Sequence, residues 1–206
     1  MALQKGRTNI IGITGGVGAG KSTLLSYIKE NYNCLVILSD DVANEIKKKG
    51  YPAYESLVEA LGCGILAPDG EIDKALMAKT IFNDKNKLKT VNNILHPAVN
   101  QYIINIVDDE RKNGAYDFVF VEAALLIENG YDKIVDEMWY VYADEQTRRI
   151  RLKASRGYSD EKVTDILKSQ LSDEAFRKHC DFVIDNSGEN KKAFSEIDNR
   201  LQLWKI

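Results

Sequence analysis

Eight residues near the start of the chain have the types and the spacing needed to hold a phosphate group. Residues 15–22 read GGVGAGKS and satisfy the pattern G-x-x-x-x-G-K-[ST]. In such a stretch, glycines let backbone N–H groups turn toward phosphate oxygens at a helix N-terminus, where the helix dipole favours an anion. Lys21 can reach the β- and γ-phosphates, and the Ser22 hydroxyl can bind Mg²⁺. The pattern predicts a nucleoside triphosphate site formed by Gly16, Gly18, Ala19, Gly20, Lys21, Ser22 and Thr23.

The residues on either side of this loop fit the same interpretation. Residues 9–14 read NIIGIT, a short and mostly apolar run that is typical of a buried strand. Residues 22–29 carry apolar side chains at helical spacing. The alternative is a glycine-rich turn with a chance lysine, which would not need a strand before it and a helix after it.

Acidic residues follow two further apolar runs. Residues 35–39 end at Asp40 and Asp41, and residues 117–121 end at Glu122. Ligands of open parallel sheets gather at the carboxyl ends of the strands, so we expect Asp40 to face the site. Asp41 is expected to cap a helix that starts near residue 42, although either aspartate could cap it. Glu122 is assigned to Mg²⁺ or substrate contacts.

A cluster of basic side chains follows the apolar run at 138–142. Its members are Arg148, Arg149, Arg151, Lys153 and Arg156. For most of them a solvated helix face is the simpler interpretation. Guanidinium groups that swing over the γ-phosphate could instead stabilise the charge that develops during transfer.

Five apolar runs alternate with helical patterns, which predicts a parallel, doubly wound sheet of the α/β class. They are residues 9–14, 35–39, 117–121, 138–142 and 181–185. Asp73, Asp144 and Ser159 are predicted helix N-caps.

The helical segment from residue 42 to 112 is too long for an ordinary connection between strands. It looks like an insertion that could hold an acceptor substrate. Its apolar repeat is interrupted by Pro97, so a kink or a restart of the helix is expected at His96-Pro97. On its own, a histidine before a proline is structural more often than catalytic.

Composition limits the possible functions. The chain has 206 residues, of which 29% are charged, and its net charge is −3. No basic excess supports a broad nucleic-acid surface. Three cysteines without a C-x-x-C motif suit reduced thiols in the cytoplasm. No apolar stretch is long enough for a signal peptide or a membrane span, so a membrane is not an expected partner. A nucleic acid is not expected either, because the chain has no basic excess.

The loop alone does not name a reaction. A regulatory GTPase would need an N-K-x-D motif, which the chain lacks. A DNA-handling motor would usually be larger or more basic. A small-molecule kinase needs a triphosphate cradle, an acceptor pocket, a carboxylate near the acceptor hydroxyl and a basic lid, and each part has a candidate here.

Together these residues resemble the dephospho-coenzyme A kinase family almost from end to end. The matching blocks are ITGGVGAGKST at 13–23, the run ending at Asp40, LHPAV at 95–99, LLIE at 125–128, ILKSQ at 166–170 and DFVIDNSG at 181–188. The resemblance implies a P-loop NTPase kinase fold that uses ATP and Mg²⁺ in the cytoplasm. It implies transfer of the γ-phosphate to the ribose 3′-hydroxyl of dephospho-coenzyme A, which gives coenzyme A and ADP.

The resemblance also implies a division of the chain into three parts. These are a nucleotide-binding core of residues 1–41, 113–145 and 171–206, an acceptor-binding insertion of residues 42–112 and a lid of residues 146–170. A monomer or a weak homo-oligomer is expected.

Candidate roles follow from the matching blocks, from the lid helix for the two arginines, and from the end of the strand at 117–121 for Glu122. Lys21, Asp40, Arg151 and Arg156 are the candidate catalytic residues. The candidate substrate-binding residues are Asp40, His96, Glu122 and Leu125, and Ser22 is the candidate metal ligand.

Three positions depart from the family pattern. Leu38 stands where the family commonly has the first aspartate of D-x-D, and Ala124 stands where a proline is usual. In the lid, Ser155 takes the place of the second arginine of R-x-x-x-R, with Arg156 one residue on, which on a helix is a turn of about 100°. Two alternatives therefore stay open: a related kinase for another alcohol or nucleotide, and a nucleotide-binding protein without transfer activity.

Overall fold

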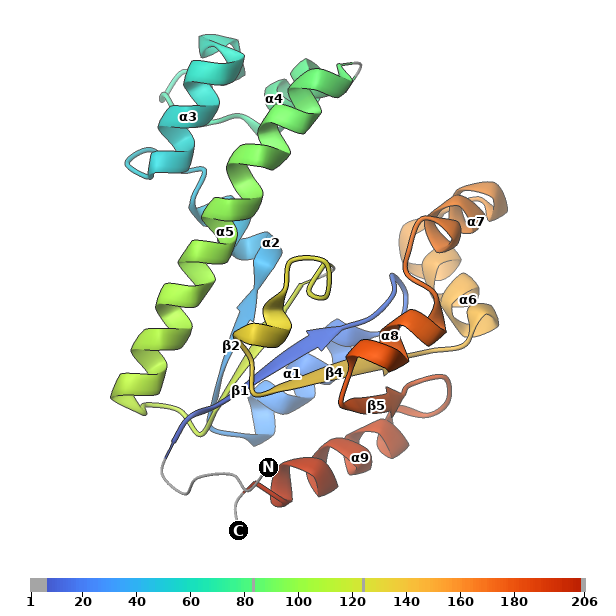
Figure 1. Ribbon diagram of the computed structural model, residues 1–206. Helices are drawn as coiled ribbons and strands as arrows, with labels where there is room; N and C mark the ends of the chain where they lie inside the picture. Colours follow the sequence, from blue (N-terminus) through green and yellow to red (C-terminus); the bar gives the residue numbers. More distant parts are fainter. Residues whose placement is uncertain (1–6, 83, 124, 205–206) are drawn as a thin grey trace. The chain divides into compact units, whose positions relative to one another are not determined.

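The computed structural model describes residues 7–82, 84–123 and 125–204. The chain forms two compact units (Figure 1). The first combines the residues up to Val36 with those from Asp109 onward, and the second is Ile37–Asp108.

A five-stranded sheet carries the candidate phosphate loop. Its strands are β1 (Asn9–Thr14), β2 (Cys34–Leu38), β3 (Phe118–Glu122), β4 (Glu137–Tyr142) and β5 (Phe182–Asp185). The strand order is β2-β3-β1-β4-β5. β1 pairs in parallel with β3 and β4, and β4 pairs in parallel with β5. The predicted parallel sheet is confirmed. Ile10, Ile11 and Ile13 of the central strand are fully buried, because parallel sheets are covered on both faces.

The helices of the first unit flank this sheet. They are α1 (Lys21–Asn31), α6 (Glu145–Arg156), α7 (Asp160–Lys168), α8 (Asp173–His179) and α9 (Asn190–Gln202). Asp144 caps α6 by accepting a hydrogen bond from the Thr147 N–H (2.8 Å), and Ser159 caps α7. Both predicted caps are confirmed. The short helix α8 was not predicted.

Helix α9 braces α1, the helix that follows the phosphate loop. The hydroxyl groups of Tyr27 and Tyr32 donate hydrogen bonds to the Asp198 carboxylate at 2.8 and 2.5 Å. The Tyr27 ring stacks on Phe194 with 4.0 Å between centroids. Burial, followed by the interaction with Asp198, raises the pKa of Tyr27. These contacts attach the C-terminal half of α1 to α9.

After β3 the chain makes hydrogen-bonded turns before the short 3₁₀ helix η2 (Tyr131–Lys133). The Asn129 N–H donates to the Leu125 carbonyl oxygen (3.0 Å), which closes one helical turn. Residues 125–130 are therefore a run of turns that includes one turn of helix. Ala124, one of the departures from the family pattern, lies outside the described residues.

The second unit is helical. It contains α2 (Ser39–Glu45), α3 (Pro52–Leu61), the 3₁₀ helix η1 (Cys63–Ile65), α4 (Lys74–Ile81) and most of α5 (Lys85–Asn113). Its core gathers around Leu57, Ile65, Met77 and Val91. Asp73 caps α4 by accepting from the N–H groups of Ala75 and Leu76, as predicted.

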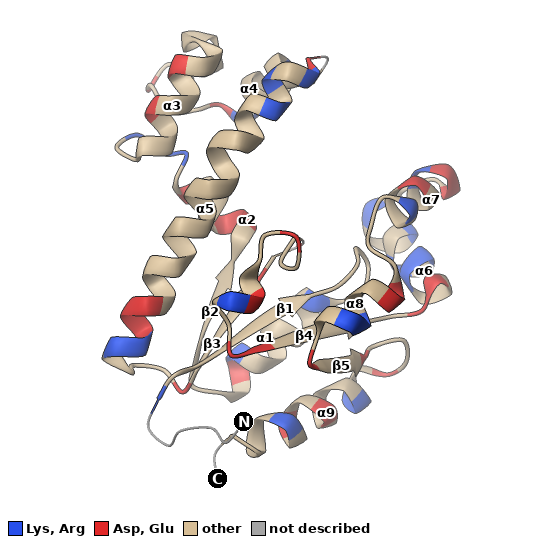
Figure 2. Cartoon of the chain, in the orientation of Figure 1, with Lys and Arg blue, Asp and Glu red and all other residues tan. Residues whose placement is uncertain are grey.

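Helix α5 runs through Pro97 without a break. The expectation of a restart at His96-Pro97 is therefore wrong. Proline removes one hydrogen bond to the preceding turn, but Val91, Val99 and Ile103 are buried on both sides of it and hold the helix together. Residues 90–107 carry no Asp, Glu, Lys or Arg, and Figure 2 shows this uncharged middle of α5.

The start of α2 also differs from the prediction. The helix begins at Ser39, its N-cap is Leu38, and no side chain caps it. Asp41 is therefore not a cap, because both Asp40 and Asp41 lie inside the first turn. Carboxylates in this turn are favoured by the positive end of the helix dipole, which gives these residues a structural role without a cap hydrogen bond.

The three cysteines are free thiols. Cys34 and Cys180 are half-buried, whereas Cys63 is exposed in η1. Burial raises the pKa of Cys34, and burial followed by the charge of Asp181 raises the pKa of Cys180 to about 12. Among the described residues, no helix is long and apolar enough to span a membrane.

Candidate active site

The phosphate loop connects β1 to α1 in the conformation that its glycines permit. Gly20 precedes α1 with a φ of 93°, in the left-handed region where other residues are strained. A β-carbon on Gly20 would collide with the Asn186 amide, and one on Gly16 would collide with the Arg148 guanidinium. Gly20 therefore requires glycine because of its backbone conformation and the close Asn186 amide, whereas a side chain at Gly16 would displace the Arg148 guanidinium.

Lys21 lies at the first position of α1 and points back over the loop. Its Nζ donates a hydrogen bond to the Gly15 carbonyl oxygen (2.8 Å) and lies 3.5 Å from Glu122 Oε1 at the end of β3. The two side chains are only 15% and 18% exposed. Two of the predicted site residues, Lys21 and Glu122, are therefore in contact in the first unit.

Three side-chain donors hold the outward-facing carbonyl groups of the loop. Arg148 Nε donates to the Val17 oxygen (2.9 Å). Arg151 Nη1 and Asn186 Nδ2 both donate to the Ala19 oxygen, at 3.2 and 2.8 Å. A trans peptide points its N–H away from its C=O, so these bonds fix the N–H groups that follow each carbonyl group. The loop is held in place by side chains that lie more than a hundred residues away in the sequence.

Gln170, in the link between α7 and α8, closes the same arrangement. Its Oε1 accepts hydrogen bonds from the Val17 N–H (3.3 Å) and from Arg148 Nη2. The sequence interpretation gave no role to Gln170 or Asn186, and it left Arg148 within a basic cluster. Gln170 and Asn186 do occur in the blocks that carry the family resemblance, which was the available signal.

Burial shapes the electrostatics around the loop. It lowers the pKa of Arg148 and raises the pKa of Tyr140 well above its usual value. The oxygens Thr14 Oγ1 and Asn186 Oδ1 are buried, and neither has a hydrogen-bond partner among the described residues. Buried polar atoms are usually paired, so both are available to a bound ligand or water.

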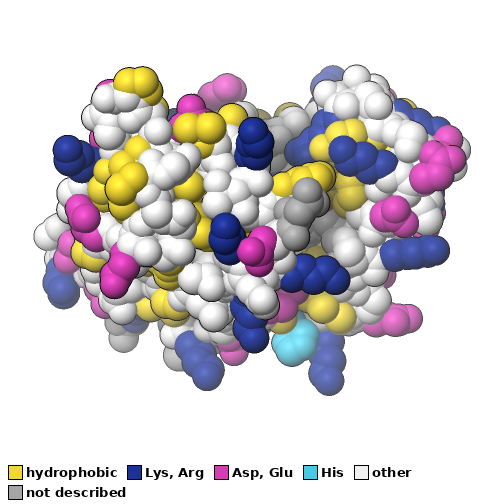
Figure 3. All heavy atoms as spheres, turned by 90° about the horizontal axis from the view of Figure 1, so that it is seen from above, with side chains coloured by type: hydrophobic (Ala, Val, Ile, Leu, Met, Phe, Trp, Pro, Cys, Tyr) yellow, Lys and Arg dark blue, Asp and Glu magenta, His cyan; other side chains and the backbone are white. Residues whose placement is uncertain are grey.

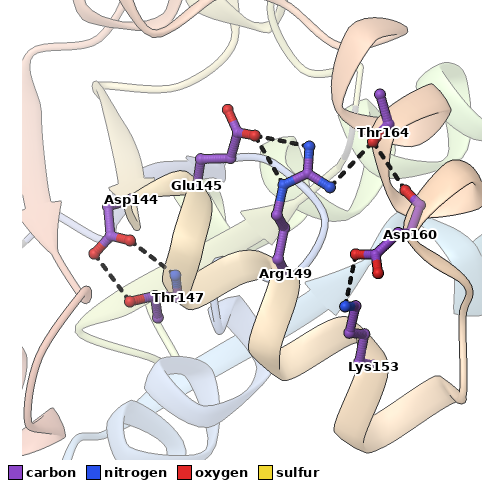
Figure 4. A network of polar contacts seen from close by, with 7 residues as sticks. All are labelled: Asp144, Glu145, Thr147, Arg149, Lys153, Asp160 and Thr164. Atoms are coloured by element: carbon purple, nitrogen blue, oxygen red, sulfur yellow. Dashed lines mark hydrogen bonds and ion pairs between the residues drawn. The ribbon is translucent and has the colours of Figure 1, made fainter.

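Helices α6 and α7 form a hairpin that a polar network holds together (Figure 4). Arg149 pairs with Glu145 (2.8 Å) and donates to Thr164 Oγ1 (3.1 Å), while Lys153 pairs with Asp160 (2.6 Å). In Figure 3, Lys and Arg side chains gather over this part of the molecule, on the right of the view.

The two predicted lid arginines differ in their surroundings. Arg151 contacts the loop through Ala19 and donates to the Asn186 carbonyl oxygen (2.9 Å). Arg156, the last residue of α6, is exposed and lies 5.9 Å from the centre of the Tyr158 ring. The geometry therefore joins Arg151, and not Arg156, to the phosphate loop.

Three further predicted site residues lie on the surface. Leu125, in the first unit, is 44% exposed after β3. Asp40, in the first turn of α2, and His96, in the middle of α5, are both exposed in the second unit. A ligand can therefore reach all three side chains.

Comparisons with known proteins agree with this site. The family model for dephospho-CoA kinase matches residues 9–192. The chain is 38% identical to a dephospho-CoA kinase of Geobacter sulfurreducens, over 95% of this chain and 97% of that protein. It is 36% identical to one of Carboxydothermus hydrogenoformans, over 95% of this chain and 94% of that protein.

Two solved structures have a similar fold. Protein TT1252 from Thermus thermophilus matches with a TM-score of 0.75 and 26% identity, over 95% of this chain and 97% of that one. A dephospho-CoA kinase from Campylobacter jejuni matches with a TM-score of 0.72 and 24% identity, over 95% and 96%. Members of the matched family phosphorylate dephospho-CoA to CoA with ATP. By its nearly full-length match to this family, the chain belongs to the dephospho-CoA kinases.

Proposed function

We propose that this chain transfers the γ-phosphate of ATP to the ribose 3′-hydroxyl of dephospho-CoA and releases CoA and ADP. The observation that carries this proposal is the position of Lys21. Its ammonium group lies over the phosphate loop, where it contacts the Gly15 carbonyl oxygen and the Glu122 carboxylate. Membership of the family supplies the acceptor.

The nucleotide part of the mechanism follows from the loop. Backbone N–H groups from Gly16 to Thr23 receive the phosphates, and Lys21 exchanges its Gly15 contact for the β- and γ-phosphate oxygens. Arg151 moves with α6 and stabilises the charge that develops on the transferred group. Little covalent chemistry is required of the protein, so positioning and electrostatics supply most of the rate.

Asp40 handles the acceptor hydroxyl. It follows the carboxyl end of β2, and parallel strands present their carboxyl ends at one edge of a sheet. A ribose hydroxyl is a poor nucleophile at neutral pH, so a carboxylate within hydrogen-bond reach orients it and accepts its proton. The rival base, Glu122, already faces the Lys21 ammonium, which supports a role beside the phosphates instead.

The remaining roles complete this proposal. Residues 42–112 bind the acceptor, with His96 and Leu125 among its contacts. Residues 146–170 form the lid, in which Arg151 has the main role and Arg156 a smaller one. The three free cysteines support a reducing, cytoplasmic setting, where the enzyme acts as a monomer or a weak homo-oligomer.

The residues present fit a magnesium ion that accompanies the nucleotide. Ser22 is exposed in the first turn of α1 and offers a hydroxyl oxygen, and Glu122, which contacts the neighbouring Lys21, offers carboxylate oxygens. Mg²⁺ in such sites takes few protein ligands and completes its shell with phosphates and water. No group of three or more His, Cys, Asp or Glu side chains in the described part of the chain could hold a metal alone. When bound, Mg²⁺ would neutralise phosphate charge.

The test is CoA formation by the purified protein with ATP, Mg²⁺ and dephospho-CoA. We expect one CoA per ADP, with the new phosphate on the 3′-oxygen as read by NMR. Adenosine and other alcohols serve as rival acceptors. A higher kcat/KM for one of these would assign the chain to another alcohol. Tight ATP binding without turnover on any acceptor would make it a nucleotide-binding protein.

A further inference from the structure

A cavity of about 400 Å³ lies entirely within the second unit, away from the phosphate loop in the sequence. The turn after α2, the segment before α4 and α4 itself line it. Its lining includes two lysines and four apolar residues, namely Lys47, Lys74, Ile72, Met77, Ala78 and Ile81. This volume falls in the range of small-molecule sites. We call this cavity the lysine pocket.

One wall of the lysine pocket is apolar. Ile72 and Ile81 are half-buried and pack against the hydrophobic cluster of the unit, to which the buried Met77 belongs. Ala78 completes this wall with a small side chain on α4. The wall is therefore an exposed edge of the core that an apolar chain of a ligand could cover.

The other wall carries two cations without partners. Neither Lys47 nor Lys74 forms an ion pair or a hydrogen bond with any side chain in the described ranges 7–82, 84–123 and 125–204. The other charged lining groups are already engaged. Lys48 pairs with Glu45 (2.5 Å), and the Glu71 carboxylate accepts a hydrogen bond from the Lys49 N–H (3.1 Å).

These two cations occupy unfavourable positions when no ligand is bound. Lys47 is half-buried, and burial followed by the charge of Lys74 lowers its pKa. Lys74 is the first residue of α4, where the helix dipole disfavours a positive charge. An anion with two negative charges would offset the repulsion between the two ammonium groups and the unfavourable helix dipole, and its attraction would compensate the burial of Lys47. Figure 2 shows the basic turn after α2 and the start of α4 in the same unit.

The pocket also has a fixed relation to Asp40 along the chain. Asp40 lies in the first turn of α2, which ends at Glu45, about 7.5 Å further along the axis at 1.5 Å per residue. Lys47 lies two residues beyond that end. The charge of Asp40 acts on Lys47. In dephospho-CoA, the diphosphate is attached through the 5′-carbon of the ribose whose 3′-hydroxyl is phosphorylated. A ligand with this hydroxyl at Asp40 can therefore reach the two lysines with its diphosphate.

We propose that the lysine pocket binds the diphosphate and pantetheine arm of dephospho-CoA, with Lys47 and Lys74 on the diphosphate and Ile72, Met77 and Ile81 along the arm. This inference rests on the proposed function, which supplies the acceptor. The diphosphate carries two negative charges, one for each unpaired ammonium. The arm is a flexible chain with a branched dimethyl group, which suits an apolar wall beside a cationic one.

The first test measures the affinity for dephospho-CoA by calorimetry without ATP, together with steady-state kinetics. The variant Lys47→Gln/Lys74→Gln should weaken binding and raise the KM for dephospho-CoA by about tenfold or more, because charge-assisted hydrogen bonds are lost. The KM for ATP should stay unchanged. The control Lys79→Gln removes an exposed lysine of α4 that does not line the pocket, and it should behave as the unaltered protein.

A second pair of variants keeps both lysines and fills the space instead. Ala78→Trp should raise the KM for dephospho-CoA, whereas Ala75→Trp, on the same helix but outside the lining, should not. The fragment 4′-phosphopantetheine, which lacks the nucleoside, should compete with dephospho-CoA and not with ATP. Melting curves show whether each variant is folded.

The outcomes separate the two proposals. Turnover of dephospho-CoA with binding that is equal in the lysine variant and in Lys79→Gln would overturn the pocket and leave the proposed function. Lysine-dependent binding without turnover would overturn the proposed function and support the pocket. A protein that neither binds nor phosphorylates dephospho-CoA would overturn both.

Discussion

The phosphate loop and the lysine pocket both have the chemistry of an anion site, but the protein treats their charges in opposite ways. Around the loop, protein groups already satisfy the cationic side chains: Lys21 faces Glu122, Arg148 contacts Val17 and Gln170, and Arg151 contacts Ala19. In the pocket, Lys47 and Lys74 line the cavity, and neither forms an ion pair with an acidic side chain among the described residues.

This difference indicates two ways of preparing for a phosphate. Hydrogen bonds fix the geometry of the loop before the ligand binds. The loop therefore needs little reordering during phosphoryl transfer. The pocket holds charge in an unfavourable state that only a ligand relieves. Changes at the loop should therefore reduce the rate and the stability together, whereas changes at the pocket should separate affinity from stability.

The largest effect is expected at the loop. Lys21→Ala should reduce kcat by ~10³ or more, because phosphoryl transfer depends on electrostatic stabilisation that no neighbouring cation replaces. Steady-state kinetics with dephospho-CoA measures this loss. Lys29→Ala, which removes an exposed lysine of the same helix, is the control. Near-normal turnover in a folded Lys21→Ala protein would contradict the loop assignment.

The two arginines of α6 sharpen the comparison within the first unit. Arg151→Ala should reduce kcat by ~10³, the usual order for an arginine that stabilises the transferred group. Arg156→Ala should have a much smaller effect, because its side chain contacts Tyr158 and not the loop. Measurements of kcat and of ATP affinity for both variants decide this. A dominant Arg156 would mean that the helix takes a different register in the closed enzyme.

Asp40 tests the chemistry on the acceptor side. Asp40→Asn should keep the affinity for ATP and reduce kcat by ~10², the range for a positioned base. Asp41→Asn, in the same helical turn, is the matched control and should keep its activity. The experiment pairs both with Glu122→Gln. If Asp40→Asn stays active while Glu122→Gln is inactive, the base is Glu122.

Asn186 tests whether the side-chain hydrogen bonds to the loop carbonyl groups matter. Asn186→Asp replaces the amide that donates to the Ala19 oxygen with a second acceptor in a buried site. We expect a loss of about 1–3 kcal/mol in the free energy of unfolding and about tenfold or more in kcat/KM for ATP. Denaturant titration and kinetics measure the two losses. Asn190→Asp, at the exposed start of α9, should change neither.

The smallest effect is expected at the pocket, where removing a lysine should raise the stability of the fold instead of lowering it. The pKa of Lys47 is lowered by burial and by Lys74, with Asp40 acting weakly against them, so the unfolded chain binds this proton more tightly. Its charge therefore destabilises the fold at neutral pH. The destabilisation disappears as the pH rises through the lowered pKa toward the usual lysine value.

Lys47→Met should therefore raise the melting temperature at pH 7, by at most about 2–4 °C because the group is partly solvated. The gain should shrink between pH 7 and pH 10. Lys79→Met is the control. A lower melting temperature at pH 7 would show that the Lys47 charge is already compensated in the ligand-free protein.

Local patterns predicted the parts of the fold that depend on a few neighbouring residues. The loop at 15–22 and the caps Asp73, Asp144 and Ser159 combine a side chain with backbone groups two or three positions away. The restart expected at Pro97 does not occur, because burial on both sides outweighs one missing hydrogen bond. Helix α8, with seven residues, is too short to show a periodic pattern.

The candidate site was predictable only where it is contiguous in sequence. The contacts of Arg148, Gln170 and Asn186 with the loop join residues more than a hundred positions apart, and no local spacing encodes them. The lysine pocket was not predicted from the sequence for a related reason. Lys47 and Lys74 read as ordinary surface lysines until the fold brings the turn after α2 beside α4.

The distribution of thiols makes the second unit chemically addressable without mutation. Cys34 and Cys180 are half-buried with raised pKa values, so little of either is thiolate at neutral pH, and the thiolate is the form that reacts. Cys63 is exposed in η1, between α3 and α4. A maleimide dye added in limiting amount should attach at Cys63 first. The native chain would then carry a single fluorescent reporter on the unit that contains the lysine pocket.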